Sequence, residues 1–255
     1  MRPITHGTIW RLTFLFAGVS ALIAGCESLP GKTSTPDYRA IVASPDRSDA
    51  DRKTDQRRKP AELLAFSGVK TGMKVLDVGA GGGYSSELVA RAVGPTGVVY
   101  AHNSQQMIDG FVKTAFDDRA QKGAMNNVVK SVREFDELAP AEVKNLDLIT
   151  MYLIYHDTTY MNVDRAKMNR RLFDLLKPGG YLVIIDHSAQ AGSDASVGKS
   201  LHRIDEALLK REVEAAGFKL VAEEDFLRNP TDPRDAPFFK MQTPTDQFAL
   251  KFVKP

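Results

Sequence analysis

Short apolar runs and longer amphipathic stretches alternate along the chain from about residue 60 to its end. The apolar runs are rich in Val, Ile, Leu and Tyr, which is typical of buried strands. We expect strands at 74–78, 98–101, 128–132, 146–153, 181–186, 219–223 and 247–253. Stretches with helical periodicity predict helices at 85–93, 105–122, 161–176 and 201–216. This alternation predicts an α/β fold, a Rossmann-like, doubly wound, seven-stranded and mostly parallel sheet with helices on both faces, whose ligands bind at the carboxyl ends of the strands.

The first 25 residues have a different pattern. Two arginines are the only charged side chains there, and an apolar run over 12–23 leads to Cys26. That run is short for a membrane span and is typical of the core of a signal peptide. The alternative interpretations are an anchor helix with an incidental cysteine, and an uncleaved N-terminus on a cytoplasmic domain.

The sequence Ile23-Ala24-Gly25-Cys26 resembles the lipobox of bacterial lipoproteins, where the cysteine is lipidated and becomes the first mature residue. The resemblance implies that residues 1–25 are a lipoprotein signal peptide, that Cys26 carries a lipid, and that this anchor attaches the protein to a membrane of the bacterial envelope. Because Glu rather than Asp follows the cysteine, we expect the outer membrane, with the domain facing the periplasm.

Residues 26–59 are expected to form a tether and an N-terminal helical segment. Pro, Gly, Ser and Thr are frequent over 27–45, which is typical of a tether. Residues 46–59 are dense in Asp, Arg and Lys, which suits a short solvated helix or a continuation of the tether. Pro60 suits the first turn of a helix, and no later linker is evident, so we expect one domain over 60–255.

Composition excludes several classes of protein. Of 255 residues, 43% are hydrophobic and 26% are charged, which excludes a disordered chain and a polytopic membrane protein. With 34 basic and 32 acidic side chains, the net charge of +2 shows no basic excess, so we expect no nucleic-acid partner. The single cysteine excludes a disulfide framework and a thiolate zinc site. The oligomeric state stays open.

The most informative motif is the sequence Val-Leu-Asp-Val-Gly-Ala-Gly-Gly-Gly-Tyr over residues 75–84. A buried strand ends here in a glycine turn that leads into a helix, and glycine lets the backbone approach a ligand closely. A dinucleotide-binding fingerprint would need a further glycine where Tyr84 stands. The spacing is instead G-x-G-x-G, with Asp77 two residues before the first glycine.

This motif resembles the first motif of class I S-adenosylmethionine-dependent methyltransferases, and the resemblance extends over about 60–253. The combination resembles a group of predicted bacterial methyltransferases that carry export or lipoprotein signals. The resemblance implies S-adenosylmethionine as cofactor. The cofactor-binding residues that it implies are Asp77, Gly79, Ala80, Gly81, Gly83, Asn103, Ser104, Asp136 (or Glu134) and Tyr155. Most of the family has an acid where Asn103 stands, on the ribose hydroxyls, so the chain departs from the pattern there.

Histidines follow three predicted strands, at His102, His156 and His187. In a first interpretation, His156 is a general base for the methyl acceptor, oriented by Asp157 or Asp186, and these three are the expected catalytic residues.

A second interpretation has His156, His187 and His202 bind a metal with Asp186 or Asp205. Their spacing matches no metal motif, so no metal is expected. In a third interpretation the histidines cap strands and hydrogen-bond loop carbonyls.

The sequence therefore predicts methyl transfer from S-adenosylmethionine to an unidentified small or envelope-associated acceptor. The alternative is a non-enzymatic or repurposed lipoprotein that binds another ligand or a metal on the same fold. Asn103 in place of an acid, and the group of histidines, favour that alternative.

Overall fold

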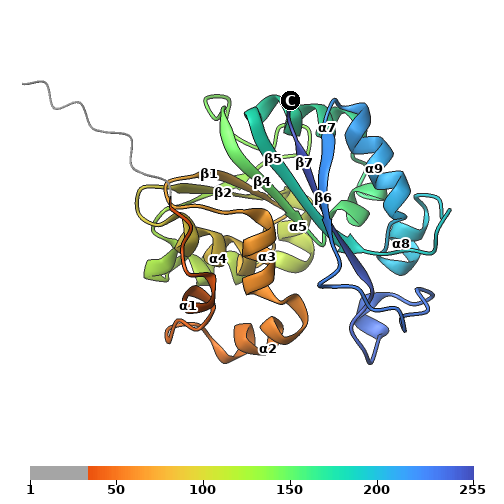
Figure 1. Ribbon diagram of the computed structural model, residues 1–255, viewed down its shortest axis with the longest axis horizontal. Helices are drawn as coiled ribbons and strands as arrows, with labels where there is room; N and C mark the ends of the chain where they lie inside the picture. The colour runs from red at the N-terminus through yellow and green to blue at the C-terminus, as the bar shows by residue number, and fades with distance from the viewer. Residues whose placement is uncertain (1–33) are drawn as a thin grey trace, which may run out of the picture. The chain divides into compact units, whose positions relative to one another are not determined.

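The computed structural model describes residues 34–255 (Figure 1). The predicted signal peptide over 1–25 and the lipidation of Cys26 lie outside the described residues. The seven strands are β1 (Lys74–Val78), β2 (Val98–Asn103), β3 (Val128–Val132), β4 (Leu146–Tyr152), β5 (Leu176–His187), β6 (Lys219–Glu224) and β7 (Gln247–Val253). They form one sheet in the order β3-β2-β1-β4-β5-β7-β6.

The sheet is parallel except for β7, which pairs antiparallel with both β5 and β6. Strand β1 lies between β2 and β4, with Val78 opposite His102 on one side and Met151 on the other. The strand order reverses at this point, so the loops after β1 and β4 diverge and leave a crevice between them. The predicted Rossmann-like sheet is confirmed. The glycine motif at the end of β1 lies where the strand order reverses.

Helices cover both faces of the sheet. Their bounds are α1 (Tyr38–Val42), α2 (Asp49–Arg58), α3 (Pro60–Ser67), α4 (Tyr84–Val93), α5 (Gln105–Met107), α6 (Ala115–Ala120), α7 (Arg165–Leu175), α8 (Val197–Leu201) and α9 (Glu206–Ala215). Short turns of other helix types are η1 (Ile108–Val112), η2 (Gly123–Met125), η3 (Tyr155–Thr159) and η4 (Phe238–Lys240). Buried side chains of α3 and α4 pack on one face, and those of α7 and α9 pack on the other.

Three predicted helices differ from the structure. The helix expected at 161–176 begins later, because the Asp164 side chain accepts a hydrogen bond from the Lys167 N–H and so fixes the N-terminus of α7. The helix expected at 105–122 is divided into α5, η1 and α6, because Gly110 lies in its middle and Lys113 has a positive φ of 47°. The helix expected at 201–216 begins later, because the Asp205 side chain accepts a hydrogen bond from the Leu208 N–H and so fixes the N-terminus of α9.

Helices α1 and α2 lie in the segment expected to be a tether and a helical segment. From residue 38 on, the prediction of a tether is wrong: α1 packs on α3 and α4, and the Tyr38 hydroxyl donates to the Val69 carbonyl at 2.6 Å. Helix α2 is held to α6 by an ion pair between Asp51 and Arg119 at 2.8 Å. Both helices are therefore part of the folded domain.

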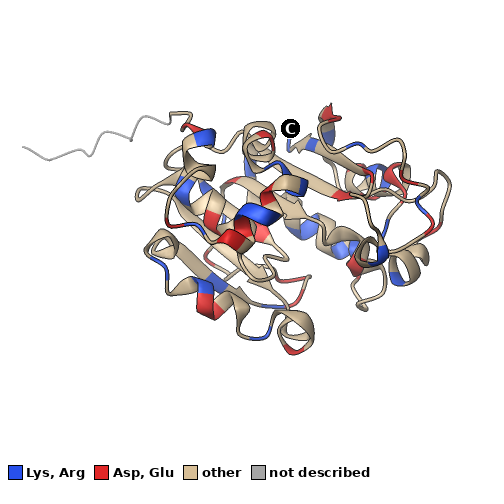
Figure 2. Cartoon of the chain, turned by 90° about the horizontal axis from the view of Figure 1, so that it is seen from below, with Lys and Arg blue, Asp and Glu red and all other residues tan. Residues whose placement is uncertain are grey.

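Two further properties bear on function. No helix within residues 34–255 is long and apolar enough to cross a membrane. Lys and Arg are interspersed with Asp and Glu over the ribbon (Figure 2), as the small net charge leads one to expect.

Candidate functional site

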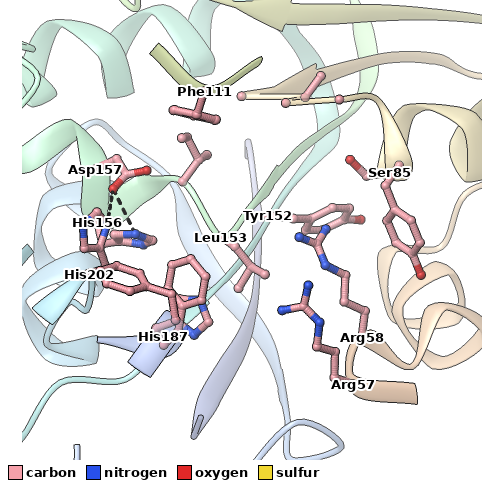
Figure 3. A pocket seen from close by; sticks show the side chains of 18 of the residues that line it. Arg57, Arg58, Ser85, Phe111, Tyr152, Leu153, His156, Asp157, His187 and His202 are labelled. Carbon is pink, nitrogen blue, oxygen red and sulfur yellow. Dashed lines mark hydrogen bonds and ion pairs between the residues drawn. The ribbon is translucent and has the colours of Figure 1, made fainter. Parts of the chain in front are cut away.

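A cavity of about 500 Å³ opens at the carboxyl ends of β1 and β4. Its wall comes from the end of α2, the glycine loop after β1, η1, the turn η3 after β4, the end of β5, the end of α8, and η4. Figure 3 shows two sides. Arg57, Arg58 and Tyr152 lie on one side, and His156, Asp157 and His202 lie on the other.

The glycine loop forms the cavity wall where the sequence predicts it. Gly79, Ala80 and Gly81 line the cavity. Gly79 has a φ of +67°, and a Cβ there would lie 2.5 Å from Ile154 Cγ1, so only glycine fits. Gly81 has a φ of +56°, and a Cβ there would meet no described atom within 4 Å. The open space beside Gly81 belongs to the cavity.

Gly83 and Asp77 support this loop from behind. Gly83 has a φ of +81° and begins α4, and a Cβ there would press on Arg119 and Phe116. The buried Asp77 carboxylate accepts hydrogen bonds from the Ser85, Ser86 and Thr150 hydroxyls at 2.6–2.8 Å. Burial raises the pKa of Asp77, while these donors oppose the shift. Asp77 therefore ties the start of α4 to β4.

Asn103 and Ser104, at the end of β2, contact the backbone. The Asn103 Oδ1 accepts from the Gly81 N–H at 2.9 Å, and its Nδ2 donates to the Gly81 carbonyl at 3.1 Å. The Ser104 hydroxyl accepts from the Met107 N–H and caps α5. Both side chains are buried, and the Asn103 amide fixes the backbone of the glycine loop.

Two predicted cofactor-binding residues are placed away from the cavity. Asp136 pairs with Lys167 at 2.6 Å on the surface. The Tyr155 hydroxyl donates to Glu212 and accepts from Asn169 in the core. The structure therefore does not bring these two side chains to the cavity. Leu153, with a φ of +59°, ends the alternation of β4 and turns Tyr155 inward, whereas Asp136 lies in a turn after β3.

His156 is buried between two carboxylates. Its Nδ1 lies 2.6 Å from Asp186 Oδ1, and its Nε2 lies 3.0 Å from Asp157 Oδ1. Burial alone lowers the pKa of His156, but the two carboxylates outweigh it and raise the pKa to about 10. An imidazole held in this way keeps its proton at neutral pH, so these contacts do not favour the expected role as a general base.

The Nε2 of His156 is in an unusual position. Although it lies 3.0 Å from Asp157, the angles do not make a hydrogen bond, and among the described residues this buried atom has no hydrogen-bond partner. A short distance without alignment is an electrostatic contact only. His156 lines the cavity, and its Nδ1 is fixed by Asp186.

Asp157 is shared by three side chains. Its Oδ1 accepts from the Tyr160 hydroxyl at 2.5 Å and lies 3.1 Å from His202 Nδ1 as well as 3.0 Å from His156 Nε2. Burial raises the pKa of Asp157, but His156, Tyr160 and His202 outweigh it and the pKa is lowered, so Asp157 is a carboxylate.

The other two histidines have separate contacts. The His187 ring lines the cavity and stacks on the Phe238 ring, with 4.9 Å between the ring centroids. Its Nδ1 forms a hydrogen bond with the Thr245 hydroxyl. His102 is inside the sheet, with Nε2 2.9 Å from the Arg133 carbonyl. For His102 the interpretation as a side chain that satisfies a backbone carbonyl is confirmed.

Arg57, Arg58, Tyr84 and the pair Phe238 and Phe239 line the cavity but were not among the predicted site residues. The Arg58 guanidinium lies 5.0 Å from the Tyr84 ring centroid, and its buried Nε has no hydrogen-bond partner within the described chain. In the sequence these arginines resemble the other charged residues of 46–59, and only the docking of α2 distinguishes them.

Comparison with known proteins gives a consistent result. The model of a family described as "Methyltransferase domain" matches residues 69–219. The ubiquinone/menaquinone biosynthesis C-methyltransferase UbiE of Idiomarina loihiensis is 32% identical over 122 residues, which cover 48% of this chain and 45% of that protein. The chain thus matches about half the length of such curated relatives.

Solved structures share the fold. A SAM-dependent methyltransferase from Aquifex aeolicus is 21% identical with a TM-score of 0.57, over 82% of this chain and 100% of that one. Fibrillarin from Aeropyrum pernix, solved with natively bound S-adenosyl-L-methionine, is 15% identical with a TM-score of 0.51, over 75% of this chain and 74% of that one.

Proposed function

The chain belongs to the class I S-adenosylmethionine-dependent methyltransferase family, and on that premise we propose that it transfers the methyl group to a small acceptor that carries an aromatic ring. The proposed acceptor rests on the aromatic side chains Phe238 and Phe239, which line the cavity beside His187 and His202.

The arginine side of the cavity fits the methionine part of the cofactor. Gly79–Gly82 line the cavity, and the space beside Gly81 is open. The Arg58 guanidinium also lines it, and its buried Nε has no partner among the described residues. A carboxylate is the group that such a guanidinium binds best. We therefore assign the cofactor carboxylate to Arg58, with Arg57 beside it. When bound, S-adenosylmethionine supplies a methyl group activated by its sulfonium.

The adenosine part is held differently from the family pattern. Asn103 takes the position of the ribose-binding acid, but both ends of its amide are bonded to Gly81. If Asn103 contacts the ribose, one of its two hydrogen bonds to Gly81 must therefore break and be replaced by a hydrogen bond to the ribose. Binding of the cofactor is then coupled to the conformation of the glycine loop.

The opposite side of the cavity suits a planar ring. Phe238 and Phe239 lie 5.3 Å apart between ring centroids, and Phe239 and Phe111 are 61% and 62% exposed although they line the cavity. Exposed aromatic rings at a cavity are typical of a binding site for an apolar ring. Relatives named ubiquinone/menaquinone biosynthesis C-methyltransferases support an acceptor of this kind.

The residues near that ring position it. The Asp157 carboxylate faces the cavity and can accept a hydrogen bond from a hydroxyl of the acceptor, while Asp186 fixes the ring of His156 beside it. Methyl transfer from a sulfonium needs mainly alignment of the acceptor atom with the methyl group, because holding two reactants in place removes much of the barrier.

A transfer assay tests this function. Full-length chain is incubated with S-adenosylmethionine labelled in its methyl group and with matched acceptors, a hydroquinone and an aliphatic diol. We expect label in the ring compound and, for Phe238→Leu, a higher KM for it. Phe226→Leu is the control, because Phe226 packs on Phe66 and not on the cavity. Equal labelling of the diol, or an unchanged KM in Phe238→Leu, would contradict the proposed acceptor.

We also propose that the domain is anchored at the bacterial envelope through a lipid on Cys26, on the support of the sequence alone. Cells that express the wild type and Cys26→Ser are fed a labelled fatty acid. The wild type should incorporate label and fractionate with the outer membrane, whereas Cys26→Ser should do neither. Labelling of both proteins would contradict the assignment.

A further inference from the structure

We propose that His156, Asp157 and His202 form a binding site for a divalent transition-metal ion, at the side of the cavity opposite Arg57 and Arg58. The site goes beyond the methyl transfer proposed above and does not depend on it. Its ligand atoms come from η3, which follows β4, and from the residue that ends α8.

The distances fit a common metal centre. Asp157 Oδ1 lies 3.0 Å from His156 Nε2 and 3.1 Å from His202 Nδ1, and one ligand atom from each residue lies within 4.8 Å of the others. Metal–nitrogen and metal–oxygen bonds are about 2.1 Å long, so neighbouring ligands at a right angle lie about 3 Å apart. The distances from Asp157 Oδ1 to His156 Nε2 and to His202 Nδ1 are of that size.

His156 Nε2 is the observation that distinguishes a metal site from an ordinary ion pair. In an ion pair, the Nε2–H of an imidazolium would point at the carboxylate of Asp157. Here Nε2 lies next to Asp157 without a hydrogen bond to it or to any other described residue, while His156 is 1% exposed and lines the cavity. An unpaired buried nitrogen is costly unless a further partner is bound.

Asp186 holds His156 through Nδ1, the nitrogen that would not bind the metal, as carboxylates beside metal-binding histidines typically do. Its Oδ1 lies 2.6 Å from His156 Nδ1, and its Oδ2 accepts from the His156 backbone N–H at 2.8 Å. A carboxylate on Nδ1 fixes the orientation of the ring and leaves Nε2 for the metal. Asp157 and Asp186 together also supply two negative charges, which match a divalent cation that takes the place of a proton on Nε2.

The donor set selects the kind of ion. Two imidazoles and one carboxylate suit zinc, iron, cobalt or nickel, whereas magnesium and calcium prefer oxygen ligands alone. Three protein ligands leave coordination positions for water or for an oxygen of a bound compound, and the open positions would face the cavity.

His202 offers the best test because its removal should leave the fold intact. Its side chain is 26% exposed, and its backbone has a φ of +50° at the C-terminus of α8. Glycine is the residue preferred in that conformation, so His202→Gly deletes the ligand without backbone strain. His187→Gln is the matched control, since it removes another histidine of the same cavity whose Nδ1 is bonded to Thr245.

In the experiment, a chelator first removes any metal from the full-length chain, which is then titrated with Co²⁺ in the absence of S-adenosylmethionine. Binding is measured by the visible absorption of the bound Co²⁺ and by calorimetry. We expect one Co²⁺ per chain, displaced by Zn²⁺ and not by Mg²⁺, with His187→Gln unchanged. Asp186→Asn should bind Co²⁺ about 10–100-fold more weakly, because the carboxylate that orients the His156 ring is lost, and His202→Gly should bind it more weakly still. Absence of Co²⁺ binding by the wild type, or equal affinity in His202→Gly, would overturn the proposal, whatever the result of the transfer assay.

Discussion

Asn103 holds Gly81 by both ends of its side-chain amide, with hydrogen bonds of 2.9 and 3.1 Å to the N–H and the carbonyl of one residue. Most of the family has an acid at this position, and an acid could make only the first of these bonds. The amide therefore fixes the glycine loop from the neighbouring strand.

Asn103→Asp should destabilise the protein by about 1–3 kcal/mol, because a carboxylate oxygen would then face the Gly81 carbonyl without a hydrogen between them. Urea denaturation at neutral pH measures this loss. Asn127→Asp is a control for the loop, since Asn127 Nδ2 donates to the Ala90 and Gly94 carbonyls elsewhere. Both variants should lose stability, but only Asn103→Asp should bind S-adenosylmethionine more weakly. Tighter binding by Asn103→Asp would instead mean that position 103 acts on the ribose as the family acid does.

Gly81→Val should abolish binding of S-adenosylmethionine, because its side chain would occupy the open space beside the loop. Gly192→Val carries the same kind of strain, since Gly192 has a φ of +82° and a Cβ there also meets no described atom within 4 Å. Calorimetry should show binding by Gly192→Val and none by Gly81→Val. Equal loss in both variants would point to general instability rather than to the cavity.

Arg58→Gln should weaken binding of S-adenosylmethionine by roughly 10–100-fold, the effect of losing a hydrogen bond to a charged group. Lys53→Gln removes a charge from an exposed position of the same helix and should have no such effect. Dissociation constants of the two variants at fixed salt test the assignment. If both bind like the wild type, the cofactor carboxylate lies elsewhere.

His102 should make the fold sensitive to acid. Burial lowers the pKa of His102 to about 4, while hydrogen bonds to backbone carbonyls oppose the shift. Since the pKa in the unfolded chain is about 6.5, the unfolded state binds the proton first as pH falls. The stabilisation is complete above about pH 6.5 and is lost toward pH 4, by up to about 3 kcal/mol.

His102→Gln keeps a donor for the Arg133 carbonyl and removes the titrating group. Urea midpoints of wild type and variant at pH 7 and pH 4.5 measure the difference. The wild type should lose more stability than the variant over this range. A loss of the same size in both would show that other groups cause the acid sensitivity.

The sequence predicted those parts of the site that depend on local pattern. The strands and the glycine loop over 75–84 follow from apolar runs and glycine spacing, and the structure has them there. His156 and Asp157 face the cavity as expected, because they follow β4 at the switch point. Where the backbone leaves regular geometry, as at Leu153, the pattern no longer determines which side a residue such as Tyr155 faces.

Other parts depend on contacts between distant segments. Arg58 reaches the cavity because α2 docks on the domain, with Asp55 bonded to Arg47 and to the Tyr84 hydroxyl. Asn103 has its role through Gly81, 22 residues away in the sequence. Neither contact has a sequence signal of its own, since charged and amide side chains are common on solvated surfaces.

Titration of S-adenosylmethionine and S-adenosylhomocysteine into the full-length chain tests the central claim most directly. Calorimetry is run with and without Zn²⁺, so that the cofactor and metal sites are measured separately. We predict one cofactor molecule per chain at micromolar affinity, about −8 kcal/mol, and its loss in Gly81→Val. No heat with either compound, with or without the metal, would contradict the claim that this cavity is a methyltransferase site.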